Sequence, residues 1–184
     1  MFQDLFGKQP LIVSLDINHE IDQKITKLVD AGLTSIELLT HSASYISHLR
    51  QHYPDLKIGI GNILNLEQLH AAYTLKPDFM STLGMLPSIL KTASVYHMRL
   101  LPGVATFTDA MQAMELGFYN VRVYPGDLNL CKQLNQYIPQ LKLYPTDINW
   151  EHIEQFLDLP SVAAVGLSNP SPFQMLQIGE SLHI

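Results

Sequence analysis

Short runs of aliphatic and β-branched residues recur along the whole chain at an interval of about 21 residues. The spacings between successive starts are 24, 23, 21, 20, 21, 21 and 21 residues. The runs begin near Pro10, Thr34, Lys57, Asp78, Met98, Tyr119, Gln140 and Ser161. A fixed period of this length indicates one supersecondary unit that is repeated. The repeat therefore limits the chain to architectures built by stacking such units side by side.

The segments between these runs have the pattern of amphipathic helices. In the first of them, aliphatic side chains recur at helical spacing and the pattern stops at Gly32, a residue type that commonly ends helices. Asn65 is placed to cap a second helix. Helical spacing places Leu66, Leu69 and Tyr73 on one face of that helix. The repeated unit is thus a strand followed by a helix.

Several of the runs carry apolar residues at successive positions, as in a parallel sheet that helices cover. Eight strand–helix units predict an α/β fold, a compact (β/α)8 TIM barrel. An open doubly wound sheet is the competing architecture, because such barrels have about 250 residues and this chain has 184. Minimal connections and a short last helix over 172–182 would account for the smaller size. We therefore predict a single domain over 1–184, with 1–9 as an N-terminal segment.

Charged residues are scarce and mostly acidic. They make up 15% of the chain, and 11 Lys and Arg against 17 Asp and Glu give a net charge of −6. This balance argues against a surface for nucleic acid or anionic lipid. The single Cys131 excludes a disulfide framework, and neither a signal peptide nor a long apolar run is present. We expect a cytoplasmic protein with no membrane span and no cofactor.

In a barrel of this type, functional side chains lie at the carboxyl ends of the strands. Hydroxyl, amide and carboxylate groups predominate at those ends, so we expect a small polar ligand. The residues that we predict to bind it are Asn62, Thr106, Tyr124, Asp127, Thr146, Asp147 and Ser168.

Four segments follow the motifs of one known barrel family. Residues 31–39 read AGLTSIELL, 59–72 read GIGNILNLEQLHAA, 101–127 read LPGVATFTDAMQAMELGFYNVRVYPGD, and 143–147 read LYPTD. These segments resemble the 2-keto-3-deoxy-6-phosphogluconate / 4-hydroxy-2-oxoglutarate aldolases, which are carbon–carbon lyases. The resemblance implies a (β/α)8 fold, a small 2-oxo or hydroxy carboxylate as partner, and a homotrimer.

The sixth predicted strand departs from the family pattern at its reactive position. The family motif is K-F-F-P-A-E, whose Lys forms a Schiff base with the substrate, whereas residues 122–127 read RVYPGD. The resemblance therefore places Arg122 at the position of the lysine. A guanidinium cannot supply the neutral amine that an imine requires. Asp147 is a second departure, because the family's seventh strand ends in P-T-G-G, whose glycine amides help to hold phosphate.

Glu37 keeps its place in the resemblance, and in the family that glutamate relays protons. A carboxylate between Ile36 and Leu38 on an inner strand needs a partner. Arg122 is the candidate, and two interpretations stay open. Either Arg122 binds a substrate carboxylate while Glu37 acts as a base, or the two form a buried ion pair that fills the site.

A second lysine and a metal ion are the other possible sources of chemistry in this sequence. Lys142 lies three residues before Pro145, as Arg122 lies three before Pro125, so it could point inward and carry a relocated Schiff base. Ligands for a divalent ion also occur near strand ends, but their spacing matches no metal motif and we predict no metal site. These ligands are Glu37, His41, Asp127 and Asp147.

Three functions follow from these observations. The first is a divergent family member that binds a small polar or carboxylate ligand at Glu37, Asn62, Arg122 and Thr146, without class I aldolase activity. The second is an active lyase that cleaves a 4-hydroxy-2-oxo acid to pyruvate and an aldehyde through Lys142 or a metal. The third is a non-catalytic pseudoenzyme whose outer helices bind a protein partner.

Overall fold

Strands and helices alternate along the chain in a computed structural model that describes residues 10–39 and 42–182. The strands are β1 (Leu11–Leu15), β2 (Ser35–Leu38), β3 (Lys57–Ile60), β4 (Phe79–Ser81), β5 (Leu100–Leu101), β6 (Gly103–Val104), β7 (Asn120–Val123), β8 (Lys142–Leu143) and β9 (Val165–Ser168). The helices are α2 (Ile21–Asp30), α3 (Ala43–His52), α4 (Leu66–Thr74), α5 (Pro87–Val95), α6 (Phe107–Glu115), α7 (Leu128–Tyr137), α8 (Ile153–Leu157), α9 (Pro172–Leu182) and the 3₁₀ turn η1 (Trp150–His152).

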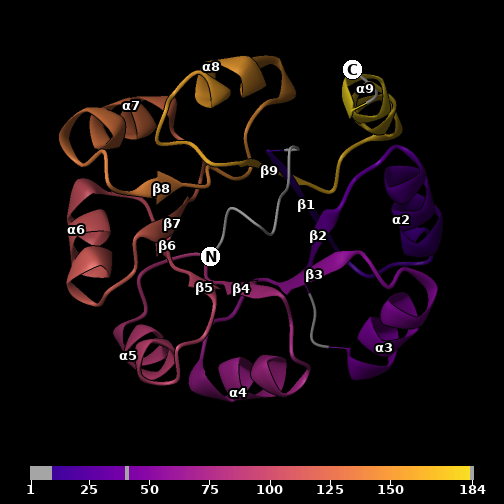
Figure 1. Cartoon of the computed structure of the whole chain (residues 1–184), viewed down its shortest axis with the longest axis horizontal. Helices are drawn as coiled ribbons and strands as arrows, with labels where there is room; N and C mark the ends of the chain where they lie inside the picture. Colours follow the sequence, from indigo (N-terminus) through magenta and orange to yellow (C-terminus); the bar gives the residue numbers. More distant parts are fainter. Residues whose placement is uncertain (1–9, 40–41, 183–184) are drawn as a thin grey trace.

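The strands pair in parallel and mainly in chain order. One sheet has the order β5-β4-β3-β2-β1-β9, and a second has the order β6-β7-β8. Figure 1 shows the strands in the middle of the molecule and the helices around them. This arrangement is an α/β fold with a parallel half-barrel sheet, and the predicted fold class is confirmed at that level.

The break between β5 and β6 has a local cause. Pro102 separates them and has no N–H to continue the ladder to β4. The next amide, that of Gly103, donates instead to Thr82 Oγ1 at 3.0 Å. On the other side of the break, the Arg122 amide donates to the Pro102 carbonyl at 2.9 Å. Two isolated parallel bridges, Leu143 with Val162 and Thr146 with Gly166, connect the β8 region to the β9 region.

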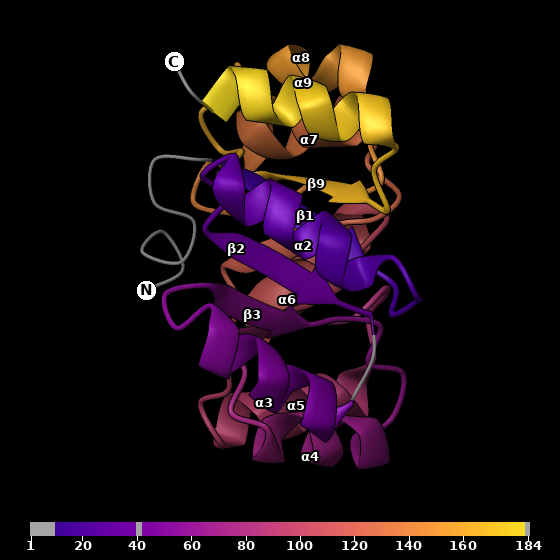
Figure 2. The ribbon, with the colours of Figure 1, turned by 90° about the vertical axis from the view of Figure 1, so that its right-hand side faces the viewer.

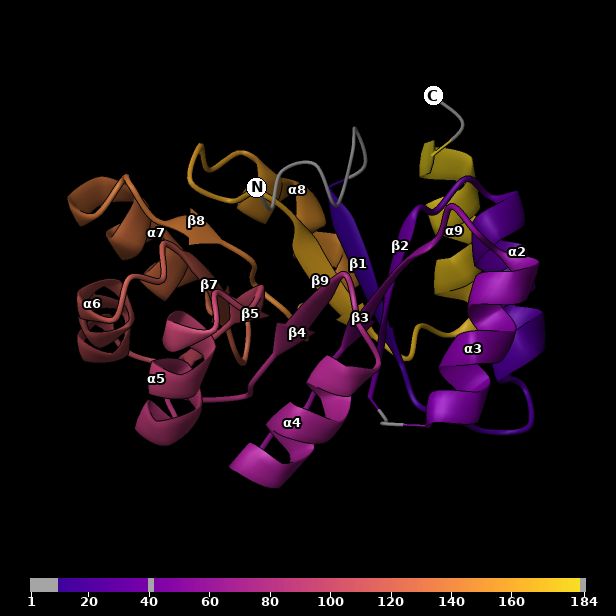
Figure 3. The same ribbon diagram turned by 60° about the horizontal axis from the view of Figure 1, so that its bottom comes forward.

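The helices lie outside the strands, as Figures 2 and 3 show from two further directions. Several begin at side-chain caps, which satisfy amides that the first turn leaves free. Asn65 accepts from the Gln68 amide as predicted, and Thr106 forms a capping box with Asp109 at the start of α6. The sequence therefore specifies these helix starts locally.

The apolar core lies mostly between strands and helices. Buried residues such as Val13, Ile36 and Ile58 face the helices, as alternation along a strand requires. The opposite face of the strands, here the inner face, holds a smaller apolar cluster. That cluster consists of Ile12, Phe79, Leu101, Tyr144 and Ala164.

The sequence located helices α4 and α9. In α4, Leu69 is buried, but Leu66 and Tyr73 are 38% and 47% exposed. The reason is that α4 buries only a narrow stripe against the sheet. The last helix, α9, has the bounds predicted from the sequence, Pro172–Leu182, and contains 11 residues. Among the described residues, no helix is both long and apolar enough to cross a bilayer.

Candidate functional site

A buried polar cluster occupies the inner face near the carboxyl ends of the strands. It consists of Ser14 on β1, Glu37 on β2, Ser81 on β4 and Arg122 on β7. All four residues are at most 3% exposed. Side chains alternate between the two faces of a strand. Each of the four residues lies either two positions after an inward-facing residue of its own strand or opposite such a residue on a paired strand. All four side chains therefore face inward. Chain segments that are far apart in sequence thus bring one carboxylate, one guanidinium and two hydroxyls together.

The Glu37 carboxylate is satisfied on both oxygens. Oε2 accepts from Ser14 Oγ at 2.7 Å, and Oε1 accepts from Ser81 Oγ at 2.5 Å. Nη1 of Arg122 donates to both oxygens at 3.0 Å. A carboxylate that is 2% exposed needs this many donors, because water cannot solvate it. Glu37 and Arg122 therefore form a buried ion pair.

Space for the Glu37 side chain comes from a glycine on the neighbouring strand. A Cβ atom at Gly61 would lie 2.7 Å from Cδ of Glu37 and 2.9 Å from each carboxylate oxygen. Any larger residue at this position would therefore displace the carboxylate. The packing of the cluster therefore requires a glycine at position 61.

Arg122 uses only part of its hydrogen-bonding capacity. Nη1 makes every side-chain hydrogen bond of Arg122 within the described part of the chain: two to Glu37 and one to Ser81 Oγ at 2.5 Å. Nε is buried and has no partner among these residues. The Tyr124 ring lies 5.6 Å from Cζ of Arg122. The buried Nε of Arg122 is therefore left without a hydrogen-bond acceptor within the described part of the chain.

Thr146 lies near this cluster on the segment that follows β8. It is 3% exposed, and its Oγ1 donates to the Tyr144 carbonyl at 3.2 Å. A Cβ at Gly166 would come within 2.6 Å of Thr146 Oγ1, so the two residues fit closely. Thr146 is therefore positioned by its neighbours before any ligand arrives.

Residues at the outer rim are more exposed and include left-handed backbone conformations. Asn62 and Asp147 have φ of 56° and 63°, values that Asn and Asp tolerate better than most residues. Asn62 and Ser168 are half-buried and Asp147 is exposed. On the adjoining strands, Asp16 Oδ2 accepts from Asn169 Nδ2 at 2.8 Å. The rim thus presents polar groups around the buried cluster.

Two predicted ligand-binding residues have structural roles. The Thr106 hydroxyl accepts from the Asp109 amide at 3.1 Å, and the Asp127 carboxylate accepts from the Leu130 amide at 3.0 Å. Both side chains therefore hold helix N-termini. Tyr124 is half-buried beside Arg122.

Lys142 lies away from the cluster. It pairs in register with Asn120, two residues before Arg122, so it stands nearer the amino ends of the strands. Its Nζ lies 3.5 Å from the Pro160 carbonyl, to which it donates. The side chains of Lys142 and Glu37 have no hydrogen bond in common among the described residues.

The side chains that could have bound a divalent ion do not form a metal site within the described residues. His41 lies outside the described residues. Within 10–39 and 42–182, no group of three or more His, Cys, Asp or Glu side chains is arranged to hold a metal ion. The oxygens of Glu37 are already used by Ser14, Ser81 and Arg122.

The two serines of the cluster were not predicted from the sequence. Ser14 and Ser81 are the hydroxyl donors to Glu37, and both are fully buried. A signal for them exists, because each is a polar residue at an inward position of an otherwise apolar strand. Thr82, whose side chain bridges the Gly84 carbonyl and the Gly103 amide, was also missed.

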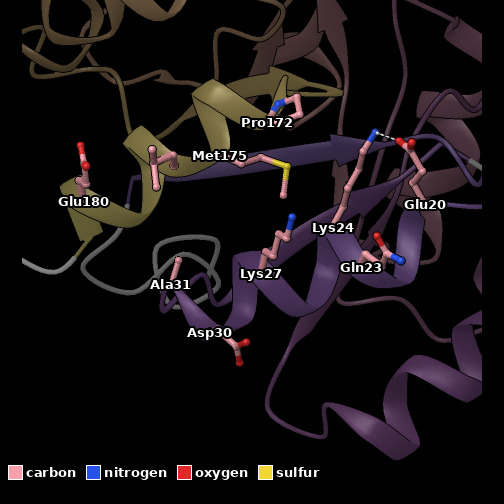
Figure 4. Close-up of a pocket in the computed structure, with 10 residues that line it drawn as sticks. Glu20, Gln23, Lys24, Lys27, Asp30, Ala31, Pro172, Met175 and Glu180 are labelled. Carbon is pink, nitrogen blue, oxygen red and sulfur yellow. Dashed lines mark ion pairs between the residues drawn. The ribbon is translucent and has the colours of Figure 1, made fainter.

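Surface pockets occur elsewhere on the molecule. One of about 590 Å³ lies between α2 and α9, on the outer side of the helices. Figure 4 shows Lys24 paired with Glu20 there, while Lys27 extends toward Met175. A smaller pocket lies beside Asp127 and His152. Neither pocket contains a residue of the buried cluster.

The family profile and the related proteins that match this chain all describe aldolases. The family profile described as "KDPG and KHG aldolase" matches residues 8–184. A 2-dehydro-3-deoxy-phosphogluconate aldolase of Pseudomonas aeruginosa is 26% identical over 163 residues, which cover 84% of this chain and 74% of that protein. The enzyme of the same name from Haemophilus influenzae is 29% identical over 163 residues, which cover 84% of this chain and 77% of that protein.

A similar solved structure is KDPG aldolase from Legionella pneumophila, with pyruvate captured as a covalent carbinolamine intermediate. Its TM-score with this chain is 0.84 at 24% identity, and the match covers 98% of this chain and 95% of that one. At this identity the likeness concerns the fold alone.

Proposed function

The chain belongs to the KDPG and KHG aldolase family, and from this premise we propose that it binds a small 2-oxo or hydroxy carboxylate without Schiff-base chemistry. The main support for this proposal is the hydrogen bonding of the Arg122 guanidinium. Its Nη1 is held by Glu37 and Ser81, while its Nε is buried without a partner among the described residues. A buried donor of this kind needs an acceptor.

The uncommitted edge of Arg122 suits a carboxylate. Nε–H and Nη2–H point in parallel from a rigid plane, and two carboxylate oxygens match that spacing. Glu37 occupies the other nitrogen and holds the guanidinium in place. The ion pair would thus orient Arg122 for a ligand instead of closing the site.

The rest of the proposed site lies around this edge. We place further ligand contacts on Asn62, Tyr124, Thr146 and Ser168, which lie near the carboxyl ends of β3, β7, β8 and β9. Thr106 and Asp127 would act indirectly, because their side chains hold the starts of α6 and α7.

We also propose that the strands close into one (β/α)8 barrel whose mouth is the carboxyl end of the strands. In this view β5 and β6 are one strand interrupted at Pro102. The bridges of Leu143 with Val162 and of Thr146 with Gly166 would then close the barrel between β8 and β9. The single domain over 1–184, the homotrimer and the cytoplasmic location stay predictions.

Schiff-base chemistry needs a lysine beside the ligand. A carbinolamine such as that of the Legionella protein contains a bond between carbon and an amine nitrogen, which a guanidinium does not supply at neutral pH. Arg122 is the basic residue next to Glu37. Lys142 donates to the Pro160 carbonyl at the other end of the strands. These placements favour binding over the lyase alternative.

The first test is trapping with pyruvate and borohydride, read by intact-mass spectrometry. We expect no covalent adduct on this chain, while a KDPG aldolase treated in parallel gains one. An adduct on the chain would overturn the proposal, and peptide mapping would identify the lysine that carries it, including Lys142.

The second test measures the binding of lactate, a hydroxy acid that cannot form an imine, by calorimetry. Arg122→Lys keeps the positive charge beside Glu37 but removes the two parallel donors. We expect lactate to bind the wild type and to bind this variant at least about tenfold more weakly, since hydrogen bonds to charged groups contribute about 1.5–3 kcal/mol. Equal affinities in two folded proteins would refute the role of Arg122.

The pseudoenzyme alternative makes a different prediction. If the chain acts only through a protein partner, none of these carboxylates should bind or raise the melting temperature. Lactate binding that depends on Arg122 would count against it.

A further inference from the structure

We propose that the mouth of the barrel excludes phosphate esters and takes ligands whose far end is uncharged, with Asp147 as the specificity-determining residue. This inference rests on the proposed function, because it concerns the end of the ligand opposite the carboxylate held by Arg122. It would separate this chain from relatives that are named for a phosphorylated sugar acid.

Positive charge is missing from the mouth in the described part of the chain. Apart from Arg122, the described Lys and Arg residues lie on helices, in the turns after them, or at the amino ends of strands. They are Lys24, Lys27, Arg50, Lys57, Lys76, Lys91, Arg99, Lys132 and Lys142. Arg122 is paired with Glu37 and, in the proposed function, binds the carboxylate at the other end of the ligand. A phosphate at the mouth would therefore find no described cation to neutralise it.

Three backbone amides near the ends of β8 and β9 already donate to carbonyls within the protein. Barrels of this type commonly hold phosphate in the loops after the seventh and eighth strands, which here follow β8 and β9. In these loops the Asp147 amide donates to the Gly166 carbonyl at 3.1 Å, and the Asn169 amide donates to the Ser14 carbonyl at 2.8 Å. The Gly166 amide donates to the Pro145 carbonyl at 2.7 Å. None of these three amides is left for an anion.

The helix that follows β9 has few free amides at its N-terminus. The N-terminus of a helix binds phosphate through its free amides. At the start of α9, the Gln174 amide donates to Ser171 Oγ at 3.3 Å, and the Ser171 amide donates to Gln174 Oε1 at 2.8 Å. Pro172 has no amide hydrogen to offer. This helix therefore caps itself.

Negative charge stands where the phosphate would approach. Asp147 directly follows Thr146, is exposed, and has no side-chain hydrogen bond or ion pair within the described residues. Its φ of 63° and the bond from its amide fix the backbone. Asp16, which directly follows β1, is also exposed and adds a second carboxylate at the rim. A phosphate dianion would be repelled, whereas a hydroxyl could donate to either carboxylate.

Calorimetry at low ionic strength tests this inference with two probes, 2-dehydro-3-deoxygluconate and its 6-phosphate. Low salt is needed because exposed charges are screened beyond about 10 Å at 0.1 M. We expect the wild type to bind the unphosphorylated acid at least about tenfold more tightly, the size of effect that one or two close like charges produce. Asp147→Asn keeps the size and the tolerance of a positive φ but removes the charge.

In Asp147→Asn, binding of the phosphate ester should tighten about fivefold to tenfold while binding of the unphosphorylated acid stays the same. Asp55→Asn is the matched control. It makes the same change in net charge at an exposed turn before β3, at the opposite end of the strands, and should alter neither affinity.

The outcomes separate the two proposals. Equal or tighter binding of the phosphate ester by the wild type would overturn the inference and leave carboxylate binding standing. The same would follow if Asp147→Asn and Asp55→Asn behaved alike. If neither probe binds, the proposed function itself fails and the inference fails with it.

Discussion

Removal of one partner from the buried Glu37–Arg122 pair should cost far more stability than removal of both. In Arg122→Met the carboxylate keeps the hydroxyls of Ser14 and Ser81 but loses its cation. In Glu37→Gln the guanidinium loses its anion. In the double variant no charge remains, and the Gln amide can accept from Ser81 and donate to Ser14. The Met side chain replaces the stem of the arginine.

The magnitude follows from burial and geometry. The two side chains are 4% and 2% exposed, and Nη1 lies 3.0 Å from Oε2. Leaving one charge of such a pair alone costs about 3–5 kcal/mol, whereas replacing both partners is often close to neutral. If the two changes were independent, the double variant would lose about 6–10 kcal/mol. We expect a loss below about 2 kcal/mol, and therefore a coupling energy of at least about 4 kcal/mol.

The assay is urea unfolding at neutral pH, followed by circular dichroism, for the wild type and all three variants. Each single variant should also melt about 6–20 °C lower, since about 2–4 °C corresponds to 1 kcal/mol in a domain of this size. The surface pair Glu20 and Lys24, 3.4 Å apart at i and i+4, is the matched control. The cycle of Glu20→Gln and Lys24→Met should give a coupling energy below about 0.5 kcal/mol.

Additive losses in the double variant would refute the reasoning. They would mean that Glu37 and Arg122 do not share a desolvated site in solution. A coupling energy as small as that of Glu20 and Lys24 would lead to the same conclusion.

Three further predictions follow from the cluster and its surroundings. Arg122→Lys should gain an adduct in the pyruvate and borohydride experiment, because it places an amine beside Glu37; a variant that binds pyruvate without an adduct would show that this position differs from the family's lysine. Gly61→Ala should lower the free energy of unfolding by about 1–3 kcal/mol, because the new methyl group would lie 2.7 Å from Cδ of Glu37; unchanged stability in urea would contradict this close contact. Burial raises the pKa of the Cys131 thiol from 9.0 to about 12, so its contribution to stability is complete below pH 9 and is lost as pH rises toward 12. Unfolding free energies measured from pH 8 to 12 should therefore fall less steeply in Cys131→Ala, and identical slopes would disprove this linkage.

Much of the fold could be predicted because its signals are local. The period of about 21 residues located the strand–helix units, and Asn65 marked a helix start that the structure contains. Exposure of Leu66 and Tyr73 on α4 was not predictable in the same way. Helical spacing shows which residues share a face, but the width of the buried stripe depends on how the helix meets the sheet.

The sequence by itself determined the α/β units, the family, and the presence of an acid and a base on inward-facing strand positions. It left open how those two groups meet, because Glu37 and Arg122 are 85 residues apart and the register of intervening strands sets their distance. Only the tertiary structure decided that one nitrogen of Arg122 is held by Glu37 and Ser81, while Nε has no acceptor among the described residues. The physical reason is that hydrogen-bond geometry depends on tenths of an ångström, whereas a sequence pattern specifies only faces and order.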